Sequence, residues 1–311
     1  MALSNQRSSL PTILNPVHKI SPTPGFGVAV SIGGTNGYIS AFRISGKKEI
    51  TFLNRKSFVL PIETTKEKLF HLITKNIFAV ANGRKETFPI GIGLAYPLKP
   101  LLSHGFIDGQ LLYMTKGRNI EGLVGAAVGR SYHRFLIEHY GIDTTVTVGN
   151  DAICLLLGAV GVEIAGVVGT GLNFAYWEKR QMIAPLKLGE LITFSQREVA
   201  INIESKNFDK IESTLLRDRV DKKSNDPGYS LAEKEAAGAY LYQIFNAGKK
   251  EITGADFPDL SSTDQLNDII TGAFPYPKEK ARLFAERIFH RSAQIVAIQL
   301  CGILMKLGRT K

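Results

Sequence analysis

The stretch that decides the fold is Gly27-Val-Ala-Val-Ser-Ile-Gly-Gly-Thr-Asn-Gly-Tyr-Ile-Ser-Ala-Phe-Arg-Ile44, in which two β-branched runs flank a glycine turn. Runs of this composition separated by turn residues predict paired strands, here over residues 27–32 and 37–44. A third run, Ile50–Leu53, follows the turn Ser45-Gly-Lys-Lys48. Together the three runs predict an antiparallel meander at the start of the folded chain.

Helices and strands alternate after this meander. Apolar spacing and unbroken apolar runs predict helix 65–81, strand 88–96, helix 120–140, strand 144–148, a short helix from Asn150, a hairpin of 164–168 and 173–177, and strand 198–204. The rest is predicted to be mainly helical, over residues 209–220, 230–246, 263–271 and 278–305. Interleaved strands and helices of this kind indicate an α/β fold, and the chain length permits two domains.

The chain is expected to divide into three parts. Residues 1–25 are polar and contain four of the 13 prolines, so we expect an extended leader before the first packed element. A small α/β domain is expected over residues 26–149, and a larger α/β domain over residues 150–311.

Composition excludes several classes of protein. The chain has 311 residues, of which 44% are hydrophobic and 21% charged, as in an ordinary globular protein and unlike a disordered chain or a disulfide scaffold. No apolar run reaches the roughly 18 residues of a membrane span. Cys154 and Cys301 lie 147 positions apart within apolar segments. We therefore expect a cytoplasmic protein with no membrane partner.

Basic residues are in excess, since 38 Lys and Arg stand against 28 Asp and Glu, for a formal charge of +10. They are scattered along the chain and form no basic stripe interleaved with aromatic residues, so nucleic acid is not the expected partner. A solvated basic surface is the simpler interpretation. Positive charge would also suit phosphorylated ligands.

Two glycine-rich turns that join strands are candidates for phosphate binding. The first is Ser31-Ile-Gly-Gly-Thr-Asn36 and the second is Val168-Gly-Thr-Gly-Leu-Asn173. Glycines there allow positive φ and let backbone N–H groups approach an anion without a Cβ in the way, and the hydroxyls of Thr35 and Thr170 add donors. The alternative is a pair of tight hairpins that hold no ligand. Neither turn is a P-loop, because no Gly-Lys-Ser or Gly-Lys-Thr follows it.

The pair Asn150-Asp151 stands where an apolar strand ends and a helix begins. Asp151 is there either a residue that stabilises the helix N-terminus or a general base for a hydroxyl that attacks a phosphoryl group. Other polar groups stand at the edges of apolar elements and match what sugar hydroxyls require, namely Thr115, Lys116, Asn173, Glu204 and Glu233. Taken singly, Lys116 and Glu233 also fit the role of surface charges.

These motifs, in this order, resemble the hexokinase family, in the branch of eukaryotic-type hexokinases and glucokinases. The resemblance runs from about Gly27 to Met305. Besides the two glycine turns it rests on Leu111-Leu-Tyr-Met-Thr-Lys-Gly117, Val148-Gly-Asn-Asp151, Ile201-Asn-Ile-Glu204, Asp226-Pro-Gly-Tyr-Ser-Leu-Ala-Glu-Lys234 and Arg291-Ser-Ala.

The resemblance implies an actin-like ATPase (ribonuclease-H-like) fold, with two α/β domains around a cleft that closes on a hexose. It implies an ATP- and Mg²⁺-dependent phosphotransferase that phosphorylates a glucose-like hexose at the 6-hydroxyl, with Asp151 as general base. Hexose and nucleotide are then the expected partners. The sugar would be bound by Thr115, Lys116, Asn150, Asn173, Glu204 and Glu233, close to Pro97. The phosphates would be bound by Gly33, Gly34, Thr35, Asn36, Gly169, Thr170 and Gly171.

The sequence departs from the family pattern mainly in the nucleotide half of the site. Ser31 replaces the family's Asp, through which the metal is held indirectly, so no residue is expected to ligate the metal directly. Tyr38 replaces an Arg near the phosphates, while Ala95 and Ser230 replace a sugar-contacting Ser and Gln. The chain also ends at Lys311, before the family's adenosine-binding segment. These departures keep a second hypothesis open, a sugar-binding hexokinase homologue that is catalytically weak or inactive.

Overall fold

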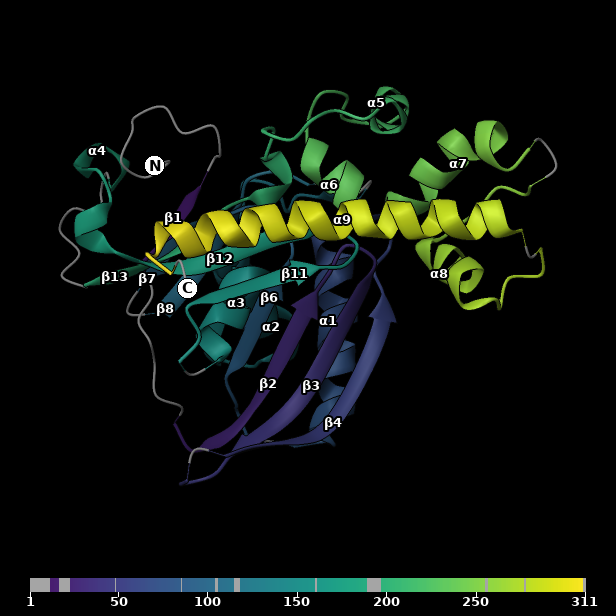
Figure 1. Cartoon of the computed structure of the whole chain (residues 1–311). Coiled ribbons are helices and arrows are strands. Elements are labelled where there is room, and N and C mark those ends of the chain that lie inside the picture. The colour runs from purple at the N-terminus through teal and green to yellow at the C-terminus, as the bar shows by residue number, and fades with distance from the viewer. Residues whose placement is uncertain are drawn as a thin grey trace.

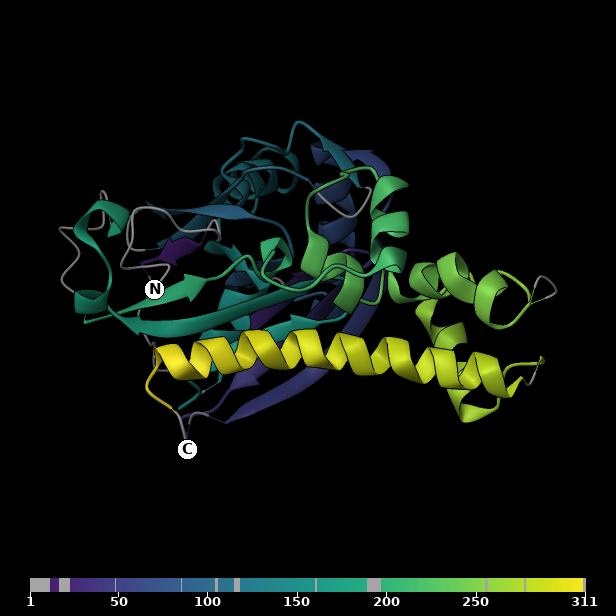
Figure 2. The ribbon, with the colours of Figure 1, turned by 45° about the horizontal axis from the view of Figure 1, so that its top comes forward.

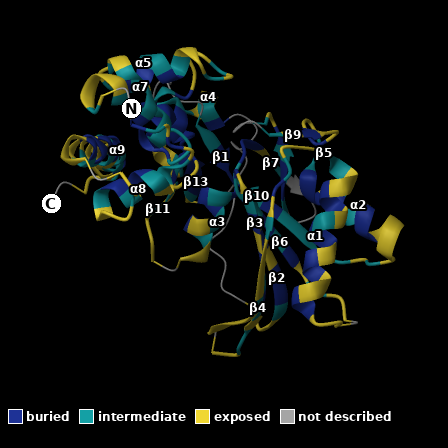
Figure 3. Ribbon diagram, turned by 90° about the vertical axis from the view of Figure 1, so that its right-hand side faces the viewer, coloured by how far each residue is buried: buried dark blue, intermediate teal, exposed yellow. Residues whose placement is uncertain are grey.

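The fold comprises two groups of strands and helices, one on either side of the molecule in Figure 3. The computed structural model describes residues 12–16, 23–47, 49–84, 86–103, 106–114, 118–159, 161–188, 197–254, 257–276 and 278–309. The first half of the chain builds one group around a five-stranded sheet. The second half builds the other around a four-stranded sheet, together with one strand from near the N-terminus.

The five-stranded sheet has the order β10-β6-β2-β3-β4. Its strands are β2 (Gly25–Ile32), β3 (Asn36–Ile44), β4 (Ile50–Val59), β6 (Ile90–Leu94) and β10 (Val146–Asn150). β2, β3 and β4 pair antiparallel, and β6 pairs parallel with both β2 and β10. The predicted meander is therefore confirmed (Figure 1), although β4 continues to Val59 instead of ending at Leu53.

Two helices cover this sheet with their apolar faces. In α1 (Lys66–Ala81), residues at helical spacing are buried, among them Leu69, Ile73 and Ile77, and the Thr65 side chain accepts a hydrogen bond from the N–H of Lys68 at 3.3 Å. α2 (Val128–Tyr140) ends at Gly141, whose φ of 65° confirms the predicted stop.

The start predicted for the second helix, at residue 120, is wrong. Residues 119–121 form the short strand β9 (Asn119–Glu121), which pairs parallel with β5 (Glu63–Thr65), and α2 begins at Val128. Gly122 and Gly125 lie between them with φ of 76° and 81°. This left-handed conformation is open to glycine and interrupts a right-handed helix.

A hairpin of β7 (Leu98–Ser103) and β8 (Phe106–Leu111) lies beside the sheet and was not among the predicted elements. Its buried Asp108 accepts hydrogen bonds from the N–H groups of Gly129 and Arg130 at 2.6 and 2.9 Å. The carboxylate thus stabilises the N-terminus of α2 from a distant part of the chain, where unpaired N–H groups favour negative charge.

The second sheet is antiparallel throughout and has the order β1-β13-β12-β11. Its strands are β1 (Ile13–Asn15), β11 (Ile164–Val168), β12 (Leu172–Lys179) and β13 (Glu198–Asn202). The prediction of a leader with no packed element before residue 25 is wrong for β1, because Leu14 is buried and pairs with Ile201. This strand has only three residues and lies between two prolines, so the sequence there showed no alternation of apolar and polar residues from which a strand could be predicted.

The remaining helices surround this sheet and form a helical layer beside it. They are α3 (Asp151–Gly158), α4 (Pro185–Leu188), α5 (Leu215–Lys222), α6 (Leu231–Ala236), α7 (Leu241–Ile252), α8 (Thr263–Thr271) and α9 (Glu279–Lys306), with single 3₁₀ turns η1 (Arg180–Met182) and η3 (Ser205–Asn207). The helix predicted over 230–246 is two helices, α6 and α7, because the chain turns at residues 237–240. The helix predicted from Asp209 begins instead at Leu215, after its N-cap Thr214.

α9 runs along the second sheet and the helical layer, as Figures 1 and 2 show from two sides. It is the one helix in the described ranges that is long and apolar enough, by length and composition, to cross a membrane. It packs against α6, α7 and α8 and buries Phe284, Ile288 and Ile295. Only 22% of its most apolar 18-residue window is buried, so one face of α9 packs on the fold while most of that window stays outside the core.

Candidate active site

Three parallel strands end at one edge of the first sheet and bring separate motifs together. Ile32 of β2 and Asn150 of β10 both lie beside Leu94 of β6 in the strand register. The first glycine turn, residues 95–97 and Asp151 therefore follow from neighbouring strand ends. This edge is where ligands bind in many sheets with parallel strands.

A cavity of about 120 Å³ lies where this edge meets the second glycine turn. It contains the predicted base and four of the six predicted sugar-binding residues. It also contains parts of both glycine turns. The lining residues that sequence analysis had singled out are Gly33, Gly34, Ala95, Pro97, Asn150, Asp151, Thr170, Gly171, Asn173, Glu204 and Glu233. The remaining two sugar-binding candidates, Thr115 and Lys116, lie outside the described residues.

Asn150 stabilises the N-terminus of helix α3, and Asp151, the next residue, lines the cavity. Asn150 is the N-cap of α3, since its Oδ1 accepts a hydrogen bond from the N–H of Ala152 at 3.0 Å. Asp151 follows as the first helical residue, and its Oδ1 accepts from the same N–H at 2.8 Å. The carboxylate thus sits in the first turn of α3 and lines the cavity.

A chain of amide and carboxylate groups runs along the side of the cavity that the second sheet forms. Asn173 Nδ2 donates to Asn202 Oδ1 at 2.9 Å, and Asn202 Nδ2 donates to Glu204 Oε1 at 2.9 Å. Asn202 is fully buried and was missed as a site residue. Its signal in the sequence was a polar residue inside the otherwise apolar run Val199–Ile203. The network holds the Glu204 carboxylate in one orientation.

Glu204 has a left-handed backbone, with φ of 55°, at the point where β13 gives way to η3. This conformation costs a residue with a side chain about 1–2 kcal/mol. Such strain often occurs at ligand-binding positions, where the surrounding structure holds the residue in place.

Lys206 is a second residue that the sequence did not reveal. Its side chain is only 9% exposed, and its Nζ lies 3.9 Å from Glu204 Oε2 and 4.8 Å from the centre of the Tyr113 ring. Burial raises the pKa of the Tyr113 phenol to about 12, with a further contribution from the carboxylates of Glu204 and Glu233. Tyr113 therefore stays neutral at physiological pH and presents its ring to the ammonium group.

The second glycine turn is fixed by contacts from both ends of α6. Glu233 Oε2 accepts a hydrogen bond from the N–H of Leu172 at 3.0 Å, and the N–H of Gly238 donates to the carbonyl of Gly169 at 2.7 Å. Glu233 is 4% exposed, so it is not a surface charge, and its predicted contact with sugar stays a prediction. None of the glycines at 33, 34, 169 and 171 has a positive φ. These glycines are therefore useful because, without a Cβ, they let the backbone approach a ligand closely, and not because they adopt a positive φ.

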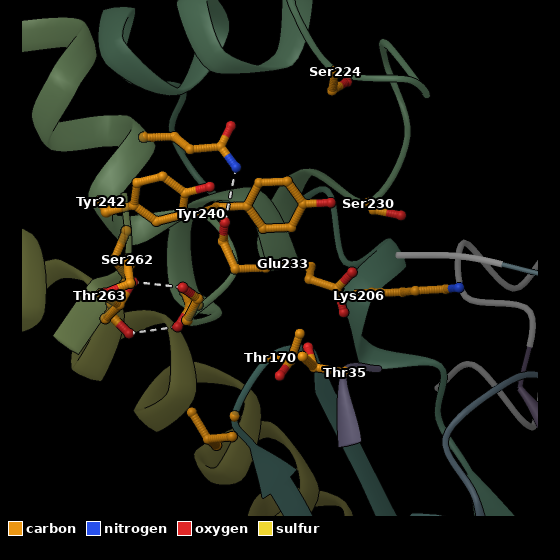
Figure 4. A pocket seen from close by; sticks show the side chains of 18 of the residues that line it. Thr35, Thr170, Lys206, Ser224, Ser230, Glu233, Tyr240, Tyr242, Ser262 and Thr263 are labelled. Carbon is orange, nitrogen blue, oxygen red and sulfur yellow. Dashed lines mark hydrogen bonds between the residues drawn. The ribbon is translucent and has the colours of Figure 1, made fainter. Parts of the chain in front are cut away.

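A larger cleft of about 1530 Å³ adjoins the small cavity and shares Thr170, Lys206 and Glu233 with it. Its walls include predicted phosphate-binding residues from both turns, and Figure 4 shows Thr35 and Thr170 among the side chains that line it. The opposite wall comes from residues around α5, α6, α7 and α8. Ser31 and Tyr38 are direct partners in the β2–β3 register, and neither lines the cleft or the small cavity.

We expect Gly238→Ala to displace the second turn. A Cβ at position 238 would lie 3.1 Å from the Gly169 carbonyl oxygen, in tight contact with backbone. Overpacking of this kind costs about 1–3 kcal/mol. Titration calorimetry should show weaker binding of MgATP, while Gly302→Ala should leave it unchanged because a Cβ there meets nothing within 4 Å. Equal MgATP affinity in both variants would show that the turn does not depend on this contact.

Comparison with known structures identifies the class of this architecture. The hexokinase of Schistosoma mansoni complexed with glucose superposes with a TM-score of 0.77 and 20% identity, covering 97% of this chain and 77% of that chain. A second hexokinase crystal structure gives a TM-score of 0.68 over 94% of this chain and 74% of that one. The fold is therefore the actin-like ATPase fold of sugar kinases, as the sequence resemblance implied.

Sequence comparison identifies the family. Two family models described as hexokinase match residues 1–160 and 163–248. Hexokinase-1 of Spinacia oleracea is 30% identical over 92% of this chain, and the glucokinase of Aspergillus niger is 27% identical over 76%. The chain belongs to the hexokinase family. It spans 66% and 54% of the length of these two relatives.

Proposed function

We propose that this chain transfers the γ-phosphoryl group of ATP to the 6-hydroxyl of a glucose-like hexose, with Asp151 as the general base. The observation that carries the proposal is the small cavity, which joins Asp151, Asn173, Glu204 and Glu233 to both glycine turns. Phosphoryl transfer requires an acceptor hydroxyl, a base and phosphate-binding groups close together.

The sugar half of the site has the chemistry that hexose hydroxyls require. Carboxylates and side-chain amides accept and donate hydrogen bonds in fixed directions, and the Asn173–Asn202–Glu204 network pre-orients them. Glu204 and Glu233 are buried, so hydrogen bonds to a bound sugar would form away from competing water.

The nucleotide half of the site offers space and hydrogen-bond donors. The large cleft has room for a nucleotide, and the hydroxyls of Thr35 and Thr170 line it. In the described residues no cluster of three His, Cys, Asp or Glu side chains forms a metal site. The residues present fit Mg²⁺ carried on nucleotide phosphates and water, where it neutralises phosphate charge. Asp151, adjacent to the cleft, would accept the proton of the sugar hydroxyl.

The test is a titration of the purified chain with glucose and, separately, with MgATP, followed by a coupled assay for glucose 6-phosphate on the same sample. Binding of both ligands with product formation supports the proposal. Glucose binding without MgATP binding would contradict it and favour the alternative, a sugar-binding hexokinase homologue without catalysis.

We expect Ser31→Asp to raise Mg²⁺-dependent turnover. Ser31 is an exposed residue beside the first glycine turn, and a carboxylate there would attract hydrated Mg²⁺ more strongly than a hydroxyl does. A series of rates against Mg²⁺ concentration should show saturation at lower concentration in the variant. Ser40→Asp on the neighbouring strand β3 is a control for added charge. An unchanged Mg²⁺ dependence would show that position 31 does not influence the metal.

A further inference from the structure

Arg118 approaches the first glycine turn from a different part of the chain. It stands just before β9, and its Nε donates a hydrogen bond to the carbonyl oxygen of Gly34 at 2.9 Å, across 84 positions of sequence. The residue is half-buried and lines the large cleft together with Thr35 and Asn36 of the same turn. The guanidinium is therefore held against the residues that sequence analysis assigned to phosphate.

The bond to Gly34 leaves most of the guanidinium for another acceptor. Arginine carries five N–H donors in a planar fork, which matches the oxygens of a phosphoryl group, and its charge is permanent. In the part of the chain that the structure describes, no ion pair to Arg118 is found. An arginine anchored through one donor to backbone is oriented before any ligand arrives, which reduces the entropy lost on binding.

The charge of Arg118 also reaches the small cavity. Burial raises the pKa of Tyr96 to about 12, and the positive charge of Arg118 opposes this shift. Tyr96 lines the small cavity together with Asp151. Arg118 thus lies near the boundary between the sugar cavity and the large cleft, the region that the transferred phosphoryl group would have to cross.

The position of Tyr38 explains why a cation at position 118 would matter for phosphate binding. The family pattern has an arginine after the first turn, but Tyr38 is 55% exposed and lines neither cavity. We propose that Arg118 binds a terminal phosphoryl group of the nucleotide at the first glycine turn, and so supplies the cation that position 38 lacks. This inference rests on the proposed function, because it assigns a residue to the nucleotide half of the same site.

Titration calorimetry of the full chain with tripolyphosphate tests the inference without requiring turnover. Arg118→Ala is expected to raise the Kd for tripolyphosphate about tenfold or more, the effect of losing a charge-assisted hydrogen bond. Arg118→Gln keeps a donor for the Gly34 carbonyl but has no charge, so it should weaken binding similarly while preserving the turn. Arg134→Ala, an exposed position on α2, is the matched control and should bind as the wild type does.

Glucose titration of each variant shows that the sugar half is intact. If Arg118→Ala loses glucose binding, Arg118→Gln decides the result. Unchanged tripolyphosphate affinity in the Arg118 variants, or no tripolyphosphate binding by the wild type, would overturn the assignment. Arg118-dependent tripolyphosphate binding by a wild type that forms no glucose 6-phosphate would refute the proposed function but support the phosphate site at Arg118.

Discussion

Asp151→Asn is expected to reduce turnover by about 10² or more and to change hexose affinity only a few-fold. The amide has nearly the shape of the carboxylate, and its oxygen can still accept the hydrogen bond that Ala152 N–H makes to Asp151 at 2.8 Å. The variant should therefore fold and bind sugar. It has no group that can take the proton of the attacking hydroxyl, so the loss should appear in kcat.

A coupled assay for glucose 6-phosphate measures the rate, and titration calorimetry measures glucose affinity on the same preparation. Asp143→Asn is a suitable control, because Asp143 is 86% exposed, bonds to His133 and lies outside both cavities. Turnover by Asp151→Asn at the wild-type rate would exclude Asp151 as the base.

Glu204→Ala is expected to abolish the thermal stabilisation that glucose gives to the folded chain. A ligand at 100 times its Kd stabilises the native state by about 2.7 kcal/mol, which a melting curve detects readily. Removing the carboxylate deletes a candidate sugar contact and releases the amide of Asn202, which donates to it at 2.9 Å. Glu163→Ala, at a half-exposed position on the surface, should retain the full glucose-dependent shift.

The same substitution leaves Lys206 buried without its nearest carboxylate, 3.9 Å away, so the free protein should also lose stability, by about 3 kcal/mol if the pair is fully desolvated. The double variant Glu204→Ala, Lys206→Met removes this penalty, and comparison with Lys206→Met alone isolates the effect of Glu204 on sugar binding, because Lys206 lines the same cavity. A glucose-dependent shift of wild-type size in the double variant would show that Glu204 does not bind the sugar.

Local signals were strong enough to predict much of the fold. β2 and β3 follow from β-branched runs around a glycine turn, and α8 follows from an apolar stripe bounded by Ser262 and Gly272. The candidate site residues were singled out because they stood at the edges of apolar elements, and Asn150 and Asp151 follow one of the parallel strands. Strand ends converge in space when strands run parallel, so a pattern along the chain became a cluster in the cavity.

Features that depend on distant partners were not predictable in this way. Lys206 resembles a surface lysine in sequence, and only its approach to Glu204 and Tyr113 explains its burial. Arg118 carries no local sign that it will contact the Gly34 carbonyl. The early start expected for α2 failed for a different reason, since two glycines with positive φ outweighed the apolar spacing of residues 120–128.

The pairing of β1 with β13 has a consequence for how the chain acquires its structure. Ile13 lies beside Asn202, 189 positions later, so this contact closes a long loop. Closure of so long a loop is entropically costly and belongs to the late steps of folding. During synthesis β1 emerges long before β13. Once β13 has formed, its edge has no partner strand until β1 pairs with it. An open edge can pair with another chain, so slow arrival of β1 exposes the protein to aggregation at this strand.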